Sequence, residues 1–164
     1  MDKWVVSNDV FFADVTSALS SGERTVTIPV KGYSMLPFIR GGKDLVELEK
    51  VDSSTVLRPR DIVLFHVGPE EGGKWIMHRI LKVKDGQLTI QGDGVTRGRE
   101  HVTASAVKAR AITILRGGTK PVDPYSKGWI LRSRIWNFLR PLRPFIIHAY
   151  RILPWNRVWL KENR

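Results

Sequence analysis

The stretch IMHRILKVKDGQLTIQ, residues 76–91, decides the fold predicted for this chain. Both halves are rich in Val, Ile and Leu, with alternating apolar and polar residues, and Asp85-Gly86 separates them. That dipeptide favours a type I′ turn, because both central residues of such a turn need a positive φ. We therefore predict a β-hairpin formed by Ile76–Lys84 and Gln87–Gln91.

Further runs rich in Val, Ile and Leu flank the hairpin on both sides. They predict a mainly β protein that forms a partly open β-barrel over residues 25–118. A short helix over residues 8–20, with Asn8 as its N-cap, is expected to precede the barrel. The hairpin's first strand is expected to begin at Lys74, and the other predicted strands are Thr25–Val30, Leu45–Val51, Asp61–Val67 and Ala106–Leu115.

The sequence divides into four segments. The expected segments are an N-terminal helix in residues 1–24, the β domain over 25–118, a linker over 119–126 and a C-terminal tail over 127–164. Gly117-Gly118 marks the end of the strand-like sequence, because glycine pairs are typical of turns and loops.

Composition limits the kinds of site and the compartment. The chain has no cysteine, which excludes disulfide bonds and thiolate metal sites. No apolar run approaches the roughly 18–20 residues of a membrane-spanning helix. The first residues also lack the apolar core of a secretory signal, so we expect the protein to stay on the side of the membrane where it is made.

Three residues of the β region suit nucleophilic catalysis. Ser34 lies in Gly32-Tyr33-Ser34-Met35-Leu36-Pro37, where a glycine permits a tight turn. His78 stands on a predicted strand, and Asp93 lies between two glycines after the partner strand. A serine, a histidine and a carboxylate can act as nucleophile, base and orienting group. Taken one at a time, the serine and the histidine are better explained as an ordinary loop serine and a core histidine, and a turn aspartate is the alternative for Asp93.

Hairpin register gives a geometric argument for two of these residues. If the strands pair directly through the Asp85-Gly86 turn, residues 78 and 93 face one another across the hairpin. We therefore expect the Asp93 carboxylate to reach the His78 imidazole and fix its tautomer.

The order of these motifs resembles the type I signal peptidase family over roughly residues 25–118. Residues 32–37 resemble the family's serine box, and Arg60-Asp61-Ile62-Val63-Leu64-Phe65 resembles its second box, with Arg60 in place of a glycine. His78-Arg79-Ile80 stands where common bacterial enzymes have a lysine base, as in the endoplasmic-reticulum and archaeal branch, and Gly92-Asp93 resembles the last box.

The resemblance implies a serine endopeptidase in which Ser34 attacks the scissile carbonyl, His78 transfers the proton and Asp93 holds His78. It implies that the Ser34 backbone N–H serves the oxyanion, and no cofactor or metal is expected. Gly32 replaces a serine found in many members, and the N-terminal anchor typical of the family is not expected here. A serine–lysine pair is the alternative, for which Lys74, Lys82 and Lys84 are nearby.

The tail is basic and aromatic. Residues 127–164 contain nine Lys and Arg against one acidic residue, and four of the six tryptophans. Prolines are expected to break the tail into two or three short helices. Helical spacing predicts one apolar face made of Leu131, Ile135, Phe138, Leu139 and Leu142, with Arg132, Arg140 and Arg143 opposite.

This composition predicts that the tail holds the protein at an anionic membrane surface. We expect a cytoplasmic, peripheral membrane protein bound to the cytoplasmic leaflet. The alternatives are a helical extension packed on the β domain and, less expected, nucleic-acid binding. The predicted substrate is the leader segment of a peptide or protein precursor. The alternative function is a catalytically inactive binding module that docks on membrane or nucleic acid through its tail.

Overall fold

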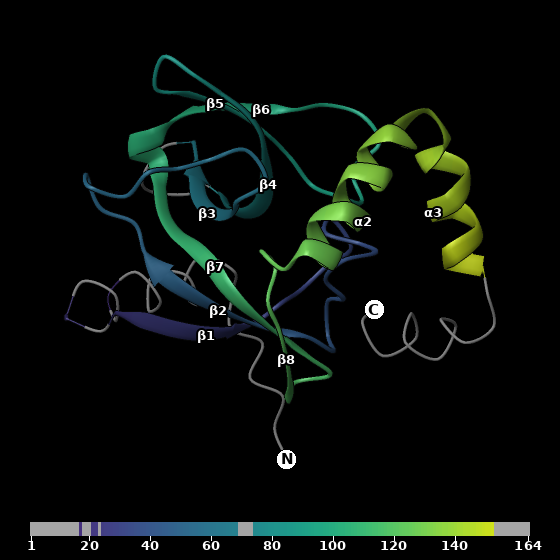
Figure 1. The fold of residues 1–164 in the computed structure, drawn as a ribbon, viewed down its shortest axis with the longest axis horizontal. Helices are drawn as coiled ribbons and strands as arrows, with labels where there is room; N and C mark the ends of the chain where they lie inside the picture. Colours follow the sequence, from purple (N-terminus) through teal and green to yellow (C-terminus); the bar gives the residue numbers. More distant parts are fainter. Residues whose placement is uncertain (1–16, 18–20, 23, 69–73, 153–164) are drawn as a thin grey trace.

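In the part of the chain that the structure describes, the protein is mainly β, with two short helices after the sheet (Figure 1). The computed structural model describes residues 17, 21–22, 24–68 and 74–152. The strands are β1 (Thr25–Pro29), β2 (Leu45–Lys50), β3 (Ile62–Val67), β4 (Lys74–Lys84), β5 (Gln87–Gln91), β6 (Glu100–Thr103), β7 (Val107–Arg116) and β8 (Lys120–Val122). The helices are α2 (Lys127–Phe138) and α3 (Arg143–Ile152), with 3-10 turns η1 (Ala104–Ala106) and η2 (Arg140–Leu142).

The strands form one open antiparallel sheet in the order β1-β2-β7-β3-β4-β5-β6, and β8 pairs with the end of β7. It is not a closed barrel. In Figure 1, β1 and β2 lie at the bottom, β5 and β6 lie at the top, and β7 runs diagonally between them. β7 pairs with both β2 and β3, so it joins the β1–β2 pair to the strands from β3 to β6.

All six predicted strands are confirmed, each within one residue at its ends. The hairpin is also confirmed, with φ of +49° at Asp85 and +72° at Gly86, as a type I′ turn requires. β6 and β8 were not predicted, because they are only 4 and 3 residues long and lack an apolar run. β8 falls inside the predicted linker. The helix predicted over residues 8–20 lies almost entirely outside the described residues.

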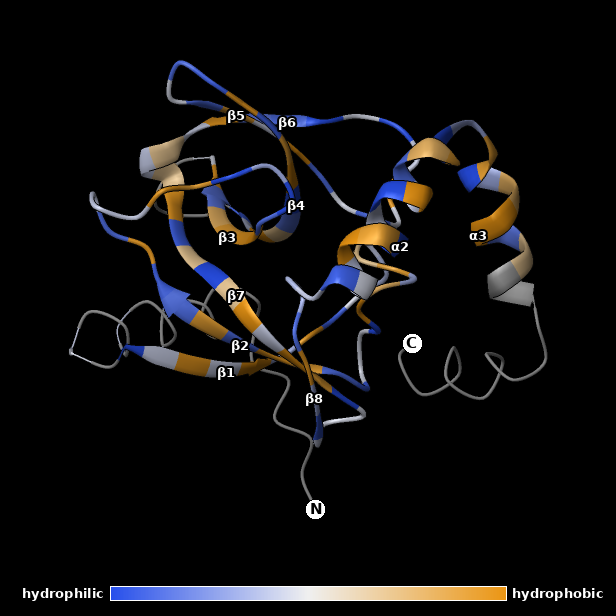
Figure 2. Cartoon of the chain, viewed as in Figure 1, coloured by the Kyte–Doolittle hydropathy of each residue, from blue (hydrophilic) through white to orange (hydrophobic). Residues whose placement is uncertain are grey.

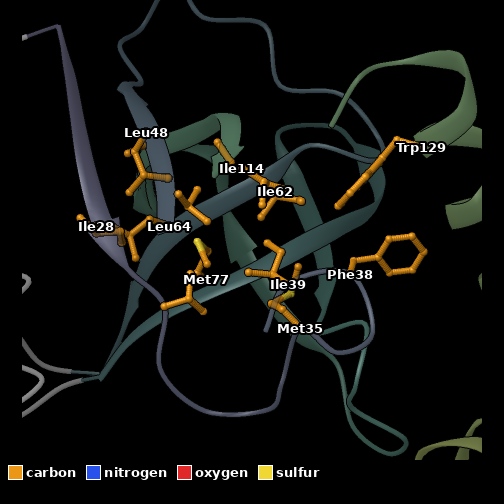
Figure 3. Packing of buried hydrophobic residues seen from close by; sticks show 14 of the residues in the cluster. Ile28, Met35, Phe38, Ile39, Leu48, Ile62, Leu64, Met77, Ile114 and Trp129 are labelled. Atoms are coloured by element: carbon orange, nitrogen blue, oxygen red, sulfur yellow. The ribbon is translucent and has the colours of Figure 1, made fainter. Parts of the chain in front are cut away.

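Side chains of β3 are buried on both faces of the sheet and divide the core in two. Ile62 and Leu64 belong to a larger cluster, which Figure 3 shows closing around Ile28, Leu48, Ile114 and Met77. Val63 and Phe65 point to the opposite face, because successive side chains alternate along a strand. There they pack with residues of β4, β5 and β7: Ile80, Leu88, Ile90 and Val107.

Helix α2 packs on the larger core through its tryptophans. Trp129 and Trp136 are buried, and their rings lie 5.2 and 6.5 Å from the Phe38 ring. Ser126 caps the helix by accepting a hydrogen bond from the Trp129 backbone N–H. The tail therefore includes a helix packed on the sheet. Its predicted break at prolines is confirmed, since Pro141 lies in η2 and Pro144 in the first turn of α3.

On α2, the apolar face predicted for the tail points away from the sheet. Leu131, Ile135 and Phe138 are exposed, while the tryptophans of the same helix face the sheet. In the part of the chain that the structure describes, every helix is too short or too polar to cross a bilayer.

Candidate functional site

Ser34 lies in a tight turn that follows β1. Gly32 has φ of +77°, a left-handed conformation that favours glycine, and the Leu36 N–H donates to the Tyr33 carbonyl at 3.1 Å. Met35 and Leu36 are 2% exposed and fasten the turn to the core, whereas Ser34 is only partly buried. The Leu36–Pro37 peptide bond is cis. The sequence thus places a serine hydroxyl at the surface of a well-anchored turn.

Asp44 holds the far end of the same loop. Its carboxylate accepts hydrogen bonds from the Arg40 backbone and side chain, from Arg116 at 2.9 Å and from the Gly117 N–H at 2.9 Å. Burial raises the pKa of Asp44, but these hydrogen bonds and charges outweigh burial and lower it below its usual value. Asp44 is therefore a buried carboxylate, and it joins the serine loop to the end of β7.

His78 lies in the middle of β4 and is 5% exposed. Its Nδ1 atom is 3.3 Å from Oε2 of Glu100, which begins β6. The imidazole also packs edge-on against the Phe65 ring, with the ring centres 6.4 Å apart. A carboxylate at Nδ1 holds one nitrogen as the proton donor and leaves Nε2 as the acceptor.

Gly92 shows where Nε2 of His78 points. A Cβ atom on Gly92 would lie 2.8 Å from Nε2 of His78 and 2.3 Å from the Ser34 carbonyl oxygen. The Gly94 N–H also donates to the Ser34 carbonyl at 2.8 Å. The segment after β5 thus runs between the serine turn and the imidazole, close to both. Only a residue without a side chain leaves room for this approach.

Asp93 does not contact His78, so the prediction that residues 78 and 93 face one another is wrong. The pairing of β4 with β5 shifts by one residue between Ile80 and Lys82, and Arg79 faces Gln91 beyond that bulge. The Asp93 carboxylate instead accepts from Nε of Arg79 at 2.9 Å and from its Nη2 at 2.7 Å.

The Arg79–Asp93 pair is almost fully buried, with side chains 1% and 4% exposed. Arg79 also donates to the Arg60 carbonyl and lies over the Phe38 ring. On the other side, the indole Nε1 of Trp136 donates to the Asp93 carbonyl at 2.8 Å. Asp93 therefore anchors the segment that carries Gly92, and helix α2 contacts the same segment.

Ser34 and His78 line one cavity of about 250 Å³. The cavity lies between the end of β1 and the first half of β4. The lysines of the alternative serine–lysine pair, Lys74, Lys82 and Lys84, are exposed and do not line it. Its remaining lining is mostly apolar, with one cation: Ile28, Pro29, Val30, Lys31, Met35, Trp75, Ile76 and Met77.

Of the three predicted site residues, Ser34 and His78 thus line the same cavity, and the carboxylate beside His78 belongs to Glu100, while that of Asp93 pairs with Arg79. Glu100 could not be predicted, because no turn or motif signals that β6 follows β5 in the sheet. Among the described residues no His, Asp and Glu side chains form a group suited to a metal ion. A hydroxyl, an imidazole and a carboxylate in this order can perform nucleophilic acyl transfer.

No family model, curated protein or solved structure matches this chain.

Proposed function

We propose that this protein is a serine endopeptidase of the signal-peptidase type, with Ser34 as its nucleophile and His78 as its general base. One observation carries the proposal. The His78 imidazole faces the Glu100 carboxylate with Nδ1 and the Gly92 segment beside Ser34 with Nε2. A carboxylate at Nδ1, with Nε2 near the turn that carries the serine, supports a general base between the two groups.

In the proposed reaction, Nε2 of His78 takes the Ser34 hydroxyl proton while Oγ forms a bond to the scissile carbonyl carbon. The backbone N–H of Ser34 donates to the oxyanion that develops. His78 then gives the proton to the leaving amine as the C–N bond breaks. Water, deprotonated by His78, hydrolyses the acyl-enzyme and frees Ser34.

Glu100 takes the orienting role that the resemblance gives to Asp93. Its carboxylate stabilises the imidazolium that forms during proton transfer, and it fixes the ring. Asp93 keeps the segment next to Ser34 in place through Arg79.

The strands around the cavity suit an extended peptide substrate. Among the described strands, β1 pairs only with β2, and β4 has no partner on its β5 side before Arg79. A precursor's leader segment can pair with these edges by β-augmentation. The apolar lining fits a small apolar side chain next to the scissile bond.

The second candidate function is an inactive binding module. It is favoured by one feature: among the described residues, the Ser34 hydroxyl makes no hydrogen bond to His78. Catalytic hydrogen bonds are often long in enzymes without substrate and shorten in the complex, so this feature is compatible with both functions.

A peptide-library experiment separates the two. The purified full chain is incubated with a proteome-derived peptide library, and new N-termini are identified by mass spectrometry. We expect cleavage after small residues by the wild type and by Ser53→Ala, a control at an exposed loop serine. Ser34→Ala and His78→Ala should yield no new termini. Equal cleavage by Ser34→Ala, or none by the wild type, would contradict the proposal.

A further inference from the structure

The helical segment that follows the sheet exposes most of the protein's unburied large apolar side chains. Among the described residues, six of the nine such side chains lie on α2, η2 or α3. Phe138 is 85% exposed and Phe145 74%, the two highest values in the set. Figure 2 shows hydrophobic bands along both helices. The six residues, which we call the helical apolar face, are Leu131, Ile135, Phe138, Leu142, Phe145 and Ile146.

The same segment has one sign of charge. Residues 124–152 contain six Lys and Arg and no Asp or Glu. Lys127, Arg132 and Arg134 are exposed on α2. A surface of this kind combines apolar side chains that gain free energy on leaving water with cations that attract an anionic partner.

We propose that the helical apolar face docks on the surface of an anionic lipid bilayer, with Phe138, Leu142 and Phe145 entering the interface. The inference does not depend on the peptidase activity. Exposed side chains at the turn between two helices can enter the bilayer–water boundary while the basic side chains beside them meet lipid phosphates.

Two other occupants fit less well. A second copy of this chain would bring a face without acidic residues against an identical cationic face, and like charges repel. Nucleic acid would pair the cations, but four of the six apolar residues are aliphatic and offer no ring for base stacking.

Several side-chain contacts attach the helical segment to the rest of the protein. Trp129 and Trp136 bury the opposite side of α2, and Arg143 lies over the Trp136 ring while donating to its carbonyl. Arg140 donates to the Gln91 side chain at the end of β5. Docking through this face would therefore orient the whole β domain, including the segment beside Ser34, relative to the membrane.

The absence of cysteine allows a direct test on the full chain. Leu142→Cys is labelled with an environment-sensitive fluorophore, and Val56→Cys, at an exposed apolar position on the sheet side, is the matched control. Vesicles of phosphatidylcholine with phosphatidylglycerol should shift the Leu142→Cys emission to the blue, and lipid-attached quenchers should quench it. The control should not respond, and pure phosphatidylcholine vesicles should bind much less protein.

A second set of variants measures the contribution of the face. Phe138→Ser combined with Phe145→Ser should weaken vesicle binding by about tenfold or more, since each loses a large apolar burial. Val56→Ser with Val67→Ser should bind like the wild type. Unchanged binding by the phenylalanine variant would overturn the proposal. A dimer in light scattering that this variant abolishes, or a blue-shifted Leu142→Cys emission without vesicles, would assign the face to a second copy or to the chain itself.

Discussion

The Nδ1 atom of His78 lies 3.3 Å from the Glu100 carboxylate, a contact that joins the middle of β4 to the first residue of β6. The imidazole is buried, whereas the Glu100 side chain is 27% exposed. A partly solvated carboxylate in this position orients the ring and can stabilise the imidazolium that forms during proton transfer. We therefore expect it to affect the rate of proton transfer.

We expect Glu100→Gln to lower kcat/KM by roughly 10- to 100-fold, less than the ~10⁴ lost when a fully buried carboxylate is removed from such a triad. The loss follows because the amide no longer orients the ring as a carboxylate does and no longer stabilises the imidazolium that forms during proton transfer. Glu47→Gln, at a half-buried glutamate of β2, is the control. An unchanged kcat/KM in Glu100→Gln would show that Glu100 does not act on His78.

Asp93 should affect stability. Asp93→Asn leaves the buried Arg79 guanidinium without its counter-charge, so the free energy of unfolding should fall by about 3–5 kcal/mol in urea titrations. Glu49→Gln breaks a half-exposed pair with Arg110 and should cost at most about 1 kcal/mol. Similar losses in the two variants would contradict this assignment.

Gly92 allows the close approach of the serine turn to His78. Gly92→Ala should lower the free energy of unfolding by about 1–3 kcal/mol or more, because the new methyl group overlaps the Ser34 carbonyl oxygen. Gly128→Ala, in the first turn of α2, meets no atom within 4 Å and should be neutral or slightly stabilising. Thermal unfolding of both variants checks the expectation, which a fully stable Gly92→Ala would contradict.

The two buried tryptophans of α2 form a matched pair. Trp136→Phe removes the donor to the Asp93 carbonyl, whereas Trp129 Nε1 is buried without a hydrogen-bond partner among the described residues. Trp136→Phe should therefore destabilise the protein by about 1–2 kcal/mol more than Trp129→Phe, as measured by chemical denaturation. The reverse order would show that packing, and not this hydrogen bond, joins α2 to the site.

Acid should weaken the serine loop through Asp44. Because the pKa of Asp44 is lowered in the folded protein, its stabilising contribution is present above its ordinary value of 3.8 and is lost as the pH falls through the folded value. Asp44→Asn should flatten the loss of stability below about pH 4.

Asp61 provides a control of opposite sign, since burial raises its pKa despite hydrogen bonds and nearby arginines. A group with a raised pKa contributes less stability as the pH rises, so Asp61→Asn should steepen the rise of stability with pH. Urea titrations between about pH 3 and pH 6, in steps of about half a pH unit, measure how the free energy of unfolding of each variant changes with pH. Equal slopes in the two variants would contradict the assigned directions.

Local patterns were sufficient to predict most strands and the hairpin. Asp85-Gly86 dictates its own turn, and alternating apolar residues mark β2, β4 and β7. The bulge between Ile80 and Lys82 has no comparable signal, because it depends on how β4 fits against its neighbours. One inserted residue moved Asp93 away from the position opposite His78.

The contacts that complete the site join distant segments of the chain. Glu100 meets His78 because β6 pairs beside β5, and sequence spacing alone does not reveal that pairing. In the tail, the helical stripe from Leu131 to Leu142 was recognised, but the tryptophans proved to be the inward face. Ring size and the hydrogen bond to the Asp93 carbonyl favour burial of Trp136 over the smaller aliphatic residues.

The packing of Trp129 and Trp136 on Phe38 has a consequence for protein engineering. A fragment ending at Gly118 would present Phe38 and the underside of the serine loop to water, and would aggregate rather than report on the isolated β region. Expression trials aimed at a minimal unit should instead retain the chain through at least Arg143, whose guanidinium completes the cover over Trp136.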